Sequence, residues 1–136
     1  MTNLTLAQSY LQKARVRLRV LDVLLAEGAY SDVIREAQEL VELAAKGMLR
    51  QAGIEPPKHH DVGGLIVEYQ ERFPFADEET AGKIAAISKW LRKEREFSFY
   101  GDIDFIPTEE YTRDDAERAY QDARFVLQQA ELVIPS

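Results

Sequence analysis

One segment of the chain, Arg92-Lys-Glu-Arg95-Glu-Phe-Ser-Phe-Tyr100-Gly-Asp102, gathers side chains suited to holding a phosphate. Arg95 follows Leu91 by four residues, so it continues the apolar stripe of a predicted helix with a cation. Because burying a guanidinium without an anion is costly, we expect Arg95 to have a partner. That partner is Glu39 or Asp102, the negative end of a helix, or an external phosphate gripped through two hydrogen bonds.

The aromatic and basic residues of this segment each allow two interpretations. Tyr100 and Phe99 could stack on a base, or they could cover the core. Basic residues cluster at positions 13–19 and 89–95, and either cluster could be a solvated helix face. The net charge of −7 opposes non-specific attraction to nucleic acid, so any contact with phosphates must be local.

Other chemistries are not supported by the residue types and their spacing. The neighbours His59-His60 point apart on a helix or strand, which argues against a metal site. Gly63-Gly64 stands inside a helical pattern, outside any phosphate-binding loop, and the serines lack a nucleophile-elbow context. Glu36, Glu39 and Glu42 share a helix face, but no other helix carries a Glu-x-x-His motif, so we expect an exposed acidic face. We therefore predict no metal and no cofactor.

Composition places the chain among soluble globular proteins with one domain. It has 136 residues, of which 46% are apolar and 30% are charged, and it contains no cysteine. No apolar run approaches the roughly 20 residues that a bilayer requires, and the N-terminus lacks the pattern of a secretion signal. We expect a cytoplasmic protein without disulfides and without a membrane association.

Apolar residues recur at spacings of three and four in the first part of the chain, which predicts two amphipathic helices. The first runs over residues 4–26 and ends at Gly28 in a left-handed cap. Ser31 is the predicted N-cap of the second, which continues until Gly53. A short loop makes these helices antiparallel partners.

A connector with consecutive prolines, residues 54–60, separates this pair from a short helix over residues 62–73, for which Asp61 is the predicted cap. Acidic residues at 77–79 favour the positive end of a fourth helix, whose apolar stripe ends at Leu91.

An aromatic loop over residues 97–107 is predicted next, and Thr112 then offers a near-capping box for the last helix. About five helices with short connections and no convincing strand predict an all-α fold, an antiparallel up-and-down bundle.

A bundle with these landmarks resembles the HEPN (higher eukaryotes and prokaryotes nucleotide-binding) domain proteins of bacteria and archaea, over nearly the whole chain. The resemblance depends on the long first helix, the helix that starts at Tyr30, the connector over residues 53–62 with its Pro and His, and the arginine late in the fourth helix. It implies a single HEPN-like domain over residues 1–136.

Active members of that family are metal-independent RNases in which an Arg is followed, after four to six residues, by a His. The His would exchange protons with the ribose 2′-hydroxyl or the leaving oxygen, and the Arg would stabilise the charge of the phosphorane. Here four residues separate Arg95 from Tyr100, and no histidine follows His60. Tyrosine, with a pKa of about 10, is a poor base near neutrality. The resemblance therefore implies a nucleotide- or RNA-binding module without RNase activity.

Two alternatives stay open, and the resemblance adds expectations about partners. The enzyme alternative is an RNase that uses Arg95 with Tyr100 or with His60, and the other is a helical adaptor that only binds proteins. The family resemblance implies a homodimer and, in toxin–antitoxin or similar modules, a small nucleotidyltransferase partner. It also implies a ligand-binding cleft near the dimer interface that contains Arg92, Arg95, Tyr100 and Asp102.

Overall fold

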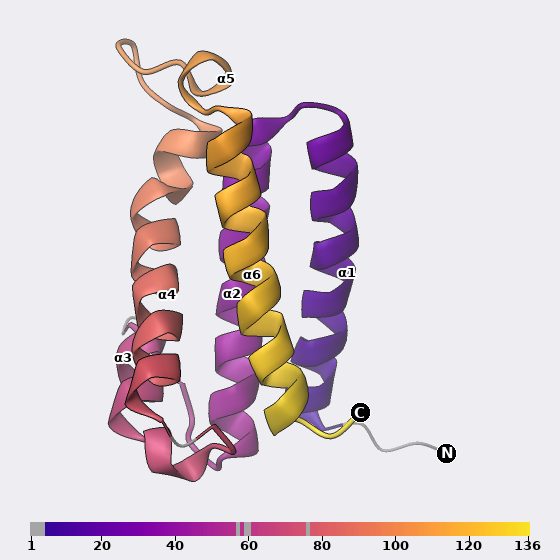
Figure 1. Ribbon diagram of the computed structural model, residues 1–136, viewed down its shortest axis with the longest axis vertical. Coiled ribbons are helices and arrows are strands. Elements are labelled where there is room, and N and C mark those ends of the chain that lie inside the picture. The colour runs from indigo at the N-terminus through magenta and orange to yellow at the C-terminus, as the bar shows by residue number, and fades with distance from the viewer. Residues whose placement is uncertain (1–4, 57, 59–60, 76) are drawn as a thin grey trace.

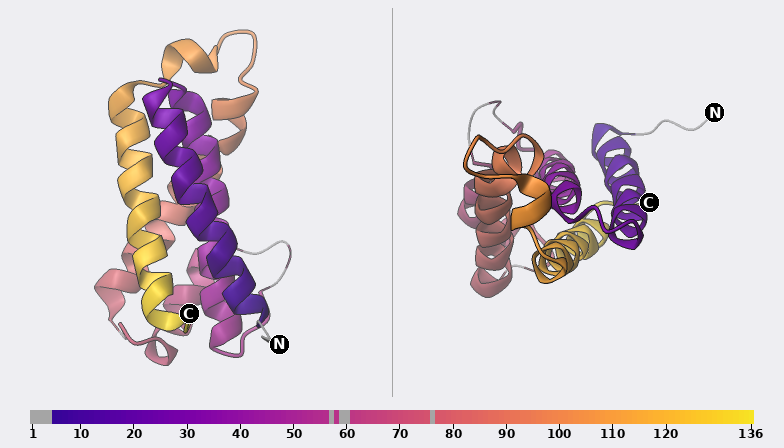
Figure 2. Two further views of the ribbon diagram at one scale, coloured as in Figure 1. Left: turned by 90° about the vertical axis from the view of Figure 1, so that its right-hand side faces the viewer. Right: turned by 90° about the horizontal axis from the view of Figure 1, so that it is seen from above.

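Four long helices stand side by side in an up-and-down bundle, and both termini lie at the same end (Figures 1 and 2). The computed structural model describes residues 5–56, 58, 61–75 and 77–136. The long helices are α1 (Leu6–Ala26), α2 (Tyr30–Gln51), α4 (Glu78–Phe99) and α6 (Arg113–Val133). The predicted all-α bundle is confirmed.

Shorter helices close the two ends of the bundle. The helix α3 (Val62–Glu68) packs on α4 and is followed by the 3-10 helix η1 (Gln70–Arg72), and α5 (Pro107–Glu110) lies at the opposite end (Figure 1). The described residues form no strand, although Asp102 and Phe105 make an isolated antiparallel bridge. Within the same residues, no helix is long and apolar enough to cross a membrane.

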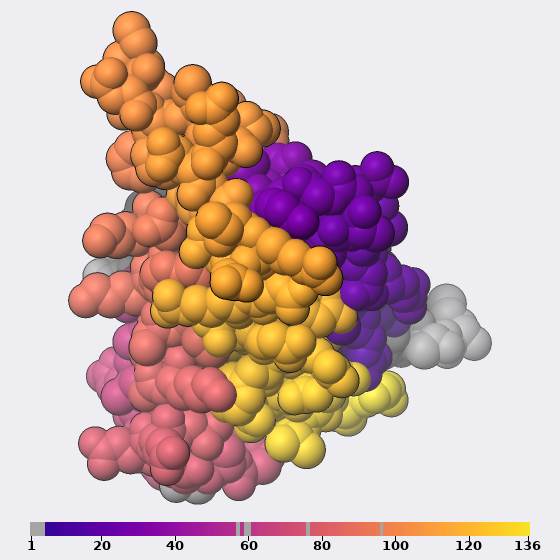
Figure 3. Space-filling view, turned by 45° about the horizontal axis from the view of Figure 1, so that its top comes forward, coloured from indigo at the N-terminus to yellow at the C-terminus, as the bar shows by residue number. Residues whose placement is uncertain are grey.

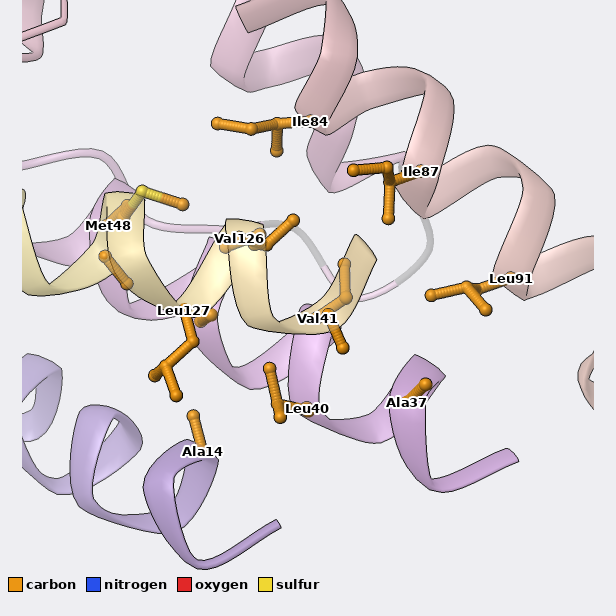
Figure 4. Packing of buried hydrophobic residues seen from close by; sticks show 14 of the residues in the cluster. Ala14, Ala37, Leu40, Val41, Met48, Ile84, Ile87, Leu91, Val126 and Leu127 are labelled. Carbon is orange, nitrogen blue, oxygen red and sulfur yellow. The ribbon is translucent and has the colours of Figure 1, made fainter. Parts of the chain in front are cut away.

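The helix α2 lies at the centre of the core and contacts α1, α4 and α6. Figure 4 shows Leu40 and Val41 of α2 surrounded by Ala14 of α1, Leu91 of α4 and Leu127 of α6. All five side chains are at most 3% exposed, and burial of each large one contributes about 1.5 to 3 kcal/mol relative to exposure. This packing fixes α2 and α4 next to each other.

The turn from α1 to α2 confirms one prediction and corrects another. Gly28 has a φ of 71° and donates its N–H to Leu25 O at 3.1 Å, while Ala29 N–H donates to Leu24 O at 2.9 Å, as in a Schellman motif. The predicted N-cap at Ser31 is wrong. Ala29 is the N-cap, because this turn already brings its carbonyl oxygen to Val33 N–H at 3.1 Å, and Ser31 is buried inside the first turn.

Side-chain caps start the later helices where the sequence predicts them. The Asp61 carboxylate accepts from Gly63 N–H at 3.0 Å, and Thr112 forms a capping box with Asp115. Asp77 accepts from the hydroxyl and the backbone N–H of Thr80 at 2.7 and 3.2 Å, and these hydrogen bonds lower the pKa of its carboxyl group. Both predicted caps, Asp61 and Thr112, are confirmed.

The helix α4 is longer than its apolar stripe predicts. The sequence predicts residues 97–99 in a loop, but the helix continues through Phe99. Ser98 is fully buried and its hydroxyl donates to Arg95 O at 2.8 Å, so the buried face continues with a small polar residue beyond Leu91. Arg92 and Arg95 thus lie within α4, and Arg95 lies beside Glu39 of α2.

Candidate functional site

A cleft of about 670 Å³ runs between α2 and the C-terminal half of α4. Its lining consists of charged and polar side chains that come from α2, from the connector before α3 and from the end of α4: Arg35, Gln38, Glu39, Glu42, Lys46, Lys58, Arg92, Arg95 and Tyr100. The core packing of α2 on α4 positions the two long walls of the cleft.

The charge of the cleft is opposite to that of the whole chain. Five cationic side chains line it against two carboxylates, whereas the chain has a net charge of −7. A local cation excess in a concave site attracts anions more strongly than scattered surface lysines do. The cleft therefore carries a local excess of positive charge on an acidic protein.

Arg95 has the internal partner that its position in the stripe predicts. Its Nη2 lies 2.7 Å from Glu39 Oε1, and the two side chains are 46% and 36% exposed. Of the alternatives left open by the sequence, Glu39 is the partner in this structure. Because the pair is partly exposed, it contributes little to stability, and the outer side of the guanidinium stays accessible.

Two more arginines are held along the cleft by contacts with side chains on its edge. Arg92 Nη1 lies 3.6 Å from Asp61 Oδ1, the oxygen that caps α3. The Arg35 guanidinium carbon lies 4.0 Å from the centroid of the Phe99 ring, a cation–π contact. The Asp61 carboxylate partly compensates the charge of Arg92, whereas Arg35 forms no ion pair within 4.0 Å among the described residues.

The aromatic residues at the end of α4 do not cover the core. Tyr100 is 72% exposed and Phe99 is 43% exposed, and their rings meet edge to face with centroids 4.8 Å apart. The interpretation that these two rings cover the core is therefore wrong. The Tyr100 ring is placed where it can stack on a planar ligand in the cleft.

Three of the four predicted site residues meet in the cleft, and the fourth lies beside it. Asp102 is not among the lining residues. It forms a turn in which its N–H donates to Phe105 O at 3.0 Å and its carboxylate accepts from Asp104 N–H at 2.9 Å. Its observed contacts are therefore those of a residue that shapes the loop after Tyr100.

The expected exposed acidic face on α2 is wrong. Glu36, Glu39 and Glu42 are half-buried. Glu39 and Glu42 line the cleft, and Glu36 lies 3.8 Å from Arg17 of α1. In an isolated sequence these carboxylates look like a solvated surface, because nothing local shows that α4 packs beside them.

The α2 wall of the cleft is the part that sequence reasoning missed. Arg35, Gln38, Glu42 and Lys46 recur at spacings of three and four, so they form a polar stripe next to the apolar one. Gln38 was the available signal, since a polar residue flanked by positions of the apolar stripe marks a buried polar site. Among the described residues no group of three or more acidic or histidine side chains is arranged to hold a metal, and His59 and His60 lie outside these residues.

The chain is similar to a family model, to a relative in sequence and to a solved structure. The model of the HEPN domain matches residues 7–133. The protein named "Putative toxin MJ1304" from Methanocaldococcus jannaschii is 30% identical over 133 residues, which cover 93% of this chain and 86% of that protein. The crystal structure of TT1696 from Thermus thermophilus superposes with a TM-score of 0.76 at 25% identity, covering 94% of this chain and 98% of that one.

Proposed function

This chain belongs to the HEPN domain family, and from that premise we propose that its cleft binds the phosphate group of a nucleotide or of an RNA. The observation that carries the proposal is the excess of cations in the cleft of an acidic protein. Arg92 and Arg95 offer planar donor forks for phosphate oxygens, and the exposed Tyr100 ring offers a stacking surface for a base.

The proposed module binds without cleaving RNA. Arg95 could stabilise a charged phosphorane, but the position that holds a histidine in active family members is occupied by Tyr100. A phenol is a poorer general base than an imidazole near neutrality, so it does not accept the 2′-hydroxyl proton efficiently. The alternative, an RNase that uses Tyr100 or His60, requires cleavage of single-stranded RNA in the presence of a metal chelator.

We also propose that the protein acts with a small nucleotidyltransferase in a two-component module of the toxin–antitoxin type. The support is family membership together with the relative from Methanocaldococcus jannaschii, whose name describes a toxin. A domain that has the arginine of the family but not its histidine suits a regulated binding role. A nucleotidyltransferase gene next to the gene for this chain would support the proposal, and a neighbourhood without one would argue for the adaptor alternative.

The central test replaces Arg95 with alanine and measures binding of a fluorescent single-stranded RNA by anisotropy. Loss of a charge-assisted hydrogen bond should weaken binding by about 1.5 to 3 kcal/mol. The melting temperature should change little, because the ion pair with Glu39 is partly exposed. Tyr100→Phe should weaken RNA binding less than Arg95→Ala does, since the ring remains available for stacking.

A control arginine outside the cleft shows whether any loss of RNA binding is specific to Arg95. Arg113→Ala removes an arginine from an exposed ion pair with Glu117, 3.1 Å long and outside the cleft, and should leave RNA affinity unchanged. If Arg95 only stabilises the fold through its ion pair with Glu39, its removal should lower the melting temperature while the affinity for RNA stays the same. That result would favour the adaptor alternative.

A further inference from the structure

The helix α2 presents two buried oxygen atoms without partners on the wall of the cleft. Gln38 is 4% exposed, and neither its Oε1 nor Oε2 of Glu42 has a hydrogen-bond partner in the part of the chain that the structure describes. Both residues line the cleft and lie four positions apart, so they are neighbours on the same helix face. Glu36 Oε2 and Arg50 Nε of α2 and Ser88 Oγ of α4 also lack hydrogen-bond partners among the described residues, but only Gln38 and Glu42 line the cleft. Because an unpartnered buried polar atom is costly, a ligand in the cleft that supplies partners to these two oxygens would be stabilised by them.

The chemistry of these atoms limits what the missing partner is. A carboxylate only accepts hydrogen bonds, while the terminal amide of Gln38 can accept or, after a half-turn, donate. The ligand must therefore present N–H or O–H donors to Glu42. Lys46 lies one helical turn further along the same wall, but the described residues contain no ion pair of Glu42 within 4.0 Å.

We propose that Gln38 and Glu42 recognise guanine, so that the ligand of the cleft is a guanine nucleotide or a guanosine in RNA; this rests on the proposed binding of a phosphate in the same cleft. Guanine carries a ring N–H and an exocyclic amino group side by side, which match the two oxygens of a carboxylate. Next to them lies its carbonyl oxygen, an acceptor for the amide of Gln38.

The other bases do not fit this pair of side chains. The corresponding edges of adenine and cytosine set an amino donor beside a ring nitrogen that accepts, and a carboxylate repels that nitrogen. Uracil places its one ring N–H between two carbonyl oxygens. Among the four RNA bases, guanine alone offers two adjacent donors to Glu42.

The positions of the cations agree with a base bound at Glu42. Lys46 lies about 6 Å from Glu42 along the axis of α2, because each residue of a helix rises about 1.5 Å. Arg92 and Arg95 line the facing wall, and Arg95 is held through Glu39, the neighbour of Gln38. A nucleotide whose base lies against α2 therefore has cationic side chains on both walls within reach of its phosphate.

The test compares guanosine and inosine 5′-monophosphates by calorimetry on the full chain, because inosine lacks only the exocyclic amino group. Guanosine monophosphate should bind about tenfold or more tightly than inosine or adenosine monophosphate, the scale of one good hydrogen-bonded base contact. Glu42→Gln should abolish that preference, because it removes the second acceptor oxygen that the exocyclic amino group needs, and it should weaken binding of guanosine monophosphate more than that of inosine monophosphate. Glu36→Gln, the same change on the same helix outside the cleft, should preserve the preference.

The results distinguish guanine recognition from the phosphate binding on which it rests. Equal binding of the three monophosphates, with competition by inorganic phosphate, would overturn guanine recognition and leave phosphate binding in place. No binding of any nucleotide or of single-stranded RNA would overturn both. Comparing guanosine monophosphate with the dinucleotide GpG identifies the source: tighter binding of GpG assigns the site to RNA, and tighter binding of the monophosphate assigns it to a free nucleotide.

Discussion

Gly101 decides where the Tyr100 ring stands at the edge of the cleft. Its φ is 64°, and a Cβ atom built on it would lie 2.2 Å from Phe105 O and 2.6 Å from Pro107 Cδ. The backbone conformation disfavours other residues, and the space beside it is filled by the turn that Asp102 begins. Glycine at this position therefore ends α4 and folds the following loop back on itself.

Replacing Gly101 with alanine should destabilise the protein more than the same change at Gly28. Both glycines have positive φ, but a Cβ at Gly28 has no atom within 4 Å. Gly28→Ala should cost about 1 kcal/mol for the left-handed conformation alone. Gly101→Ala should add the clash with Phe105 and Pro107 and lower the free energy of unfolding by about 2 to 3 kcal/mol. Alternatively, the loop after Gly101 should be displaced. Urea unfolding measures the free energies, and RNA affinity reports a displaced Tyr100. Equal effects at the two sites would contradict this account.

At the scale of the helices, the sequence predicts most of what makes a helix and little of what packs beside it. The apolar period of three and four and the caps at Asp61 and Thr112 are local features, and the structure confirms them. The predicted start of α2 at Ser31 is wrong, because the Schellman turn at Gly28 satisfies the helix start without a side-chain cap. The sequence predicts the cap at Gly28, but the glycine does not reveal that the same turn also begins α2.

The candidate site is only half predictable for a similar reason. Arg92, Arg95 and Tyr100 stand out because a cation extends an apolar stripe and an aromatic segment follows it. The opposite wall, with Arg35, Gln38 and Lys46, becomes a wall only when α4 packs beside α2. The apolar pattern also places the end of α4 too early, since the buried Ser98 continues the core face without being apolar.

The contact between Tyr111 and Glu94 ties the segment before α6 to α4, and its strength should depend on pH. The Tyr111 hydroxyl donates to Glu94 Oε2 at 2.7 Å, and burial together with this carboxylate raises the pKa of the phenol well above its usual value of about 10. A raised pKa means that the folded state binds the proton more tightly. The stabilisation is therefore complete below about pH 10 and is lost as the pH rises toward the pKa of the folded state.

Tyr111→Phe should lower the free energy of unfolding by about 0.5 to 1.5 kcal/mol at neutral pH. The difference from the unmodified protein should shrink above about pH 10, because only the unmodified protein then loses this contribution. Urea unfolding at several pH values measures it. Tyr100→Phe is the control, since Tyr100 is 72% exposed and loss of its hydroxyl should change stability little at any pH. A constant difference for Tyr111→Phe across the whole range would show that the hydrogen bond is not the cause.

At the scale of the molecule, one end of the bundle carries an apolar projection. The loop after α4 and the helix α5 stand out from the long helices (Figure 3). Three large apolar side chains of this end are exposed: Phe97 at 46%, Ile103 at 94% and Ile106 at 50%. Apolar side chains that cluster on a projection favour a protein interface, and the commonest one for a single chain is a twofold dimer. Because Tyr100 lies at the base of the projection, a second copy here would stand next to the cleft.

We predict a homodimer through this projection, in which Ile103 is an interface residue. Ile103→Asp should shift the protein toward the monomer in sedimentation velocity at micromolar concentration, because a buried carboxylate without a partner opposes association. Its helical circular dichroism should not change, since the side chain contributes nothing to the core. Leu132→Asp is the matched control: that leucine is 66% exposed on α6 near the opposite end, and its replacement should leave the dimer intact. A monomer at every concentration for the unmodified chain would refute the dimer.

The same variant shows whether the second copy contributes to the cleft. If the monomeric Ile103→Asp variant binds RNA with unchanged affinity, each cleft binds RNA without the second copy. Weaker RNA binding would mean that the second copy completes the site.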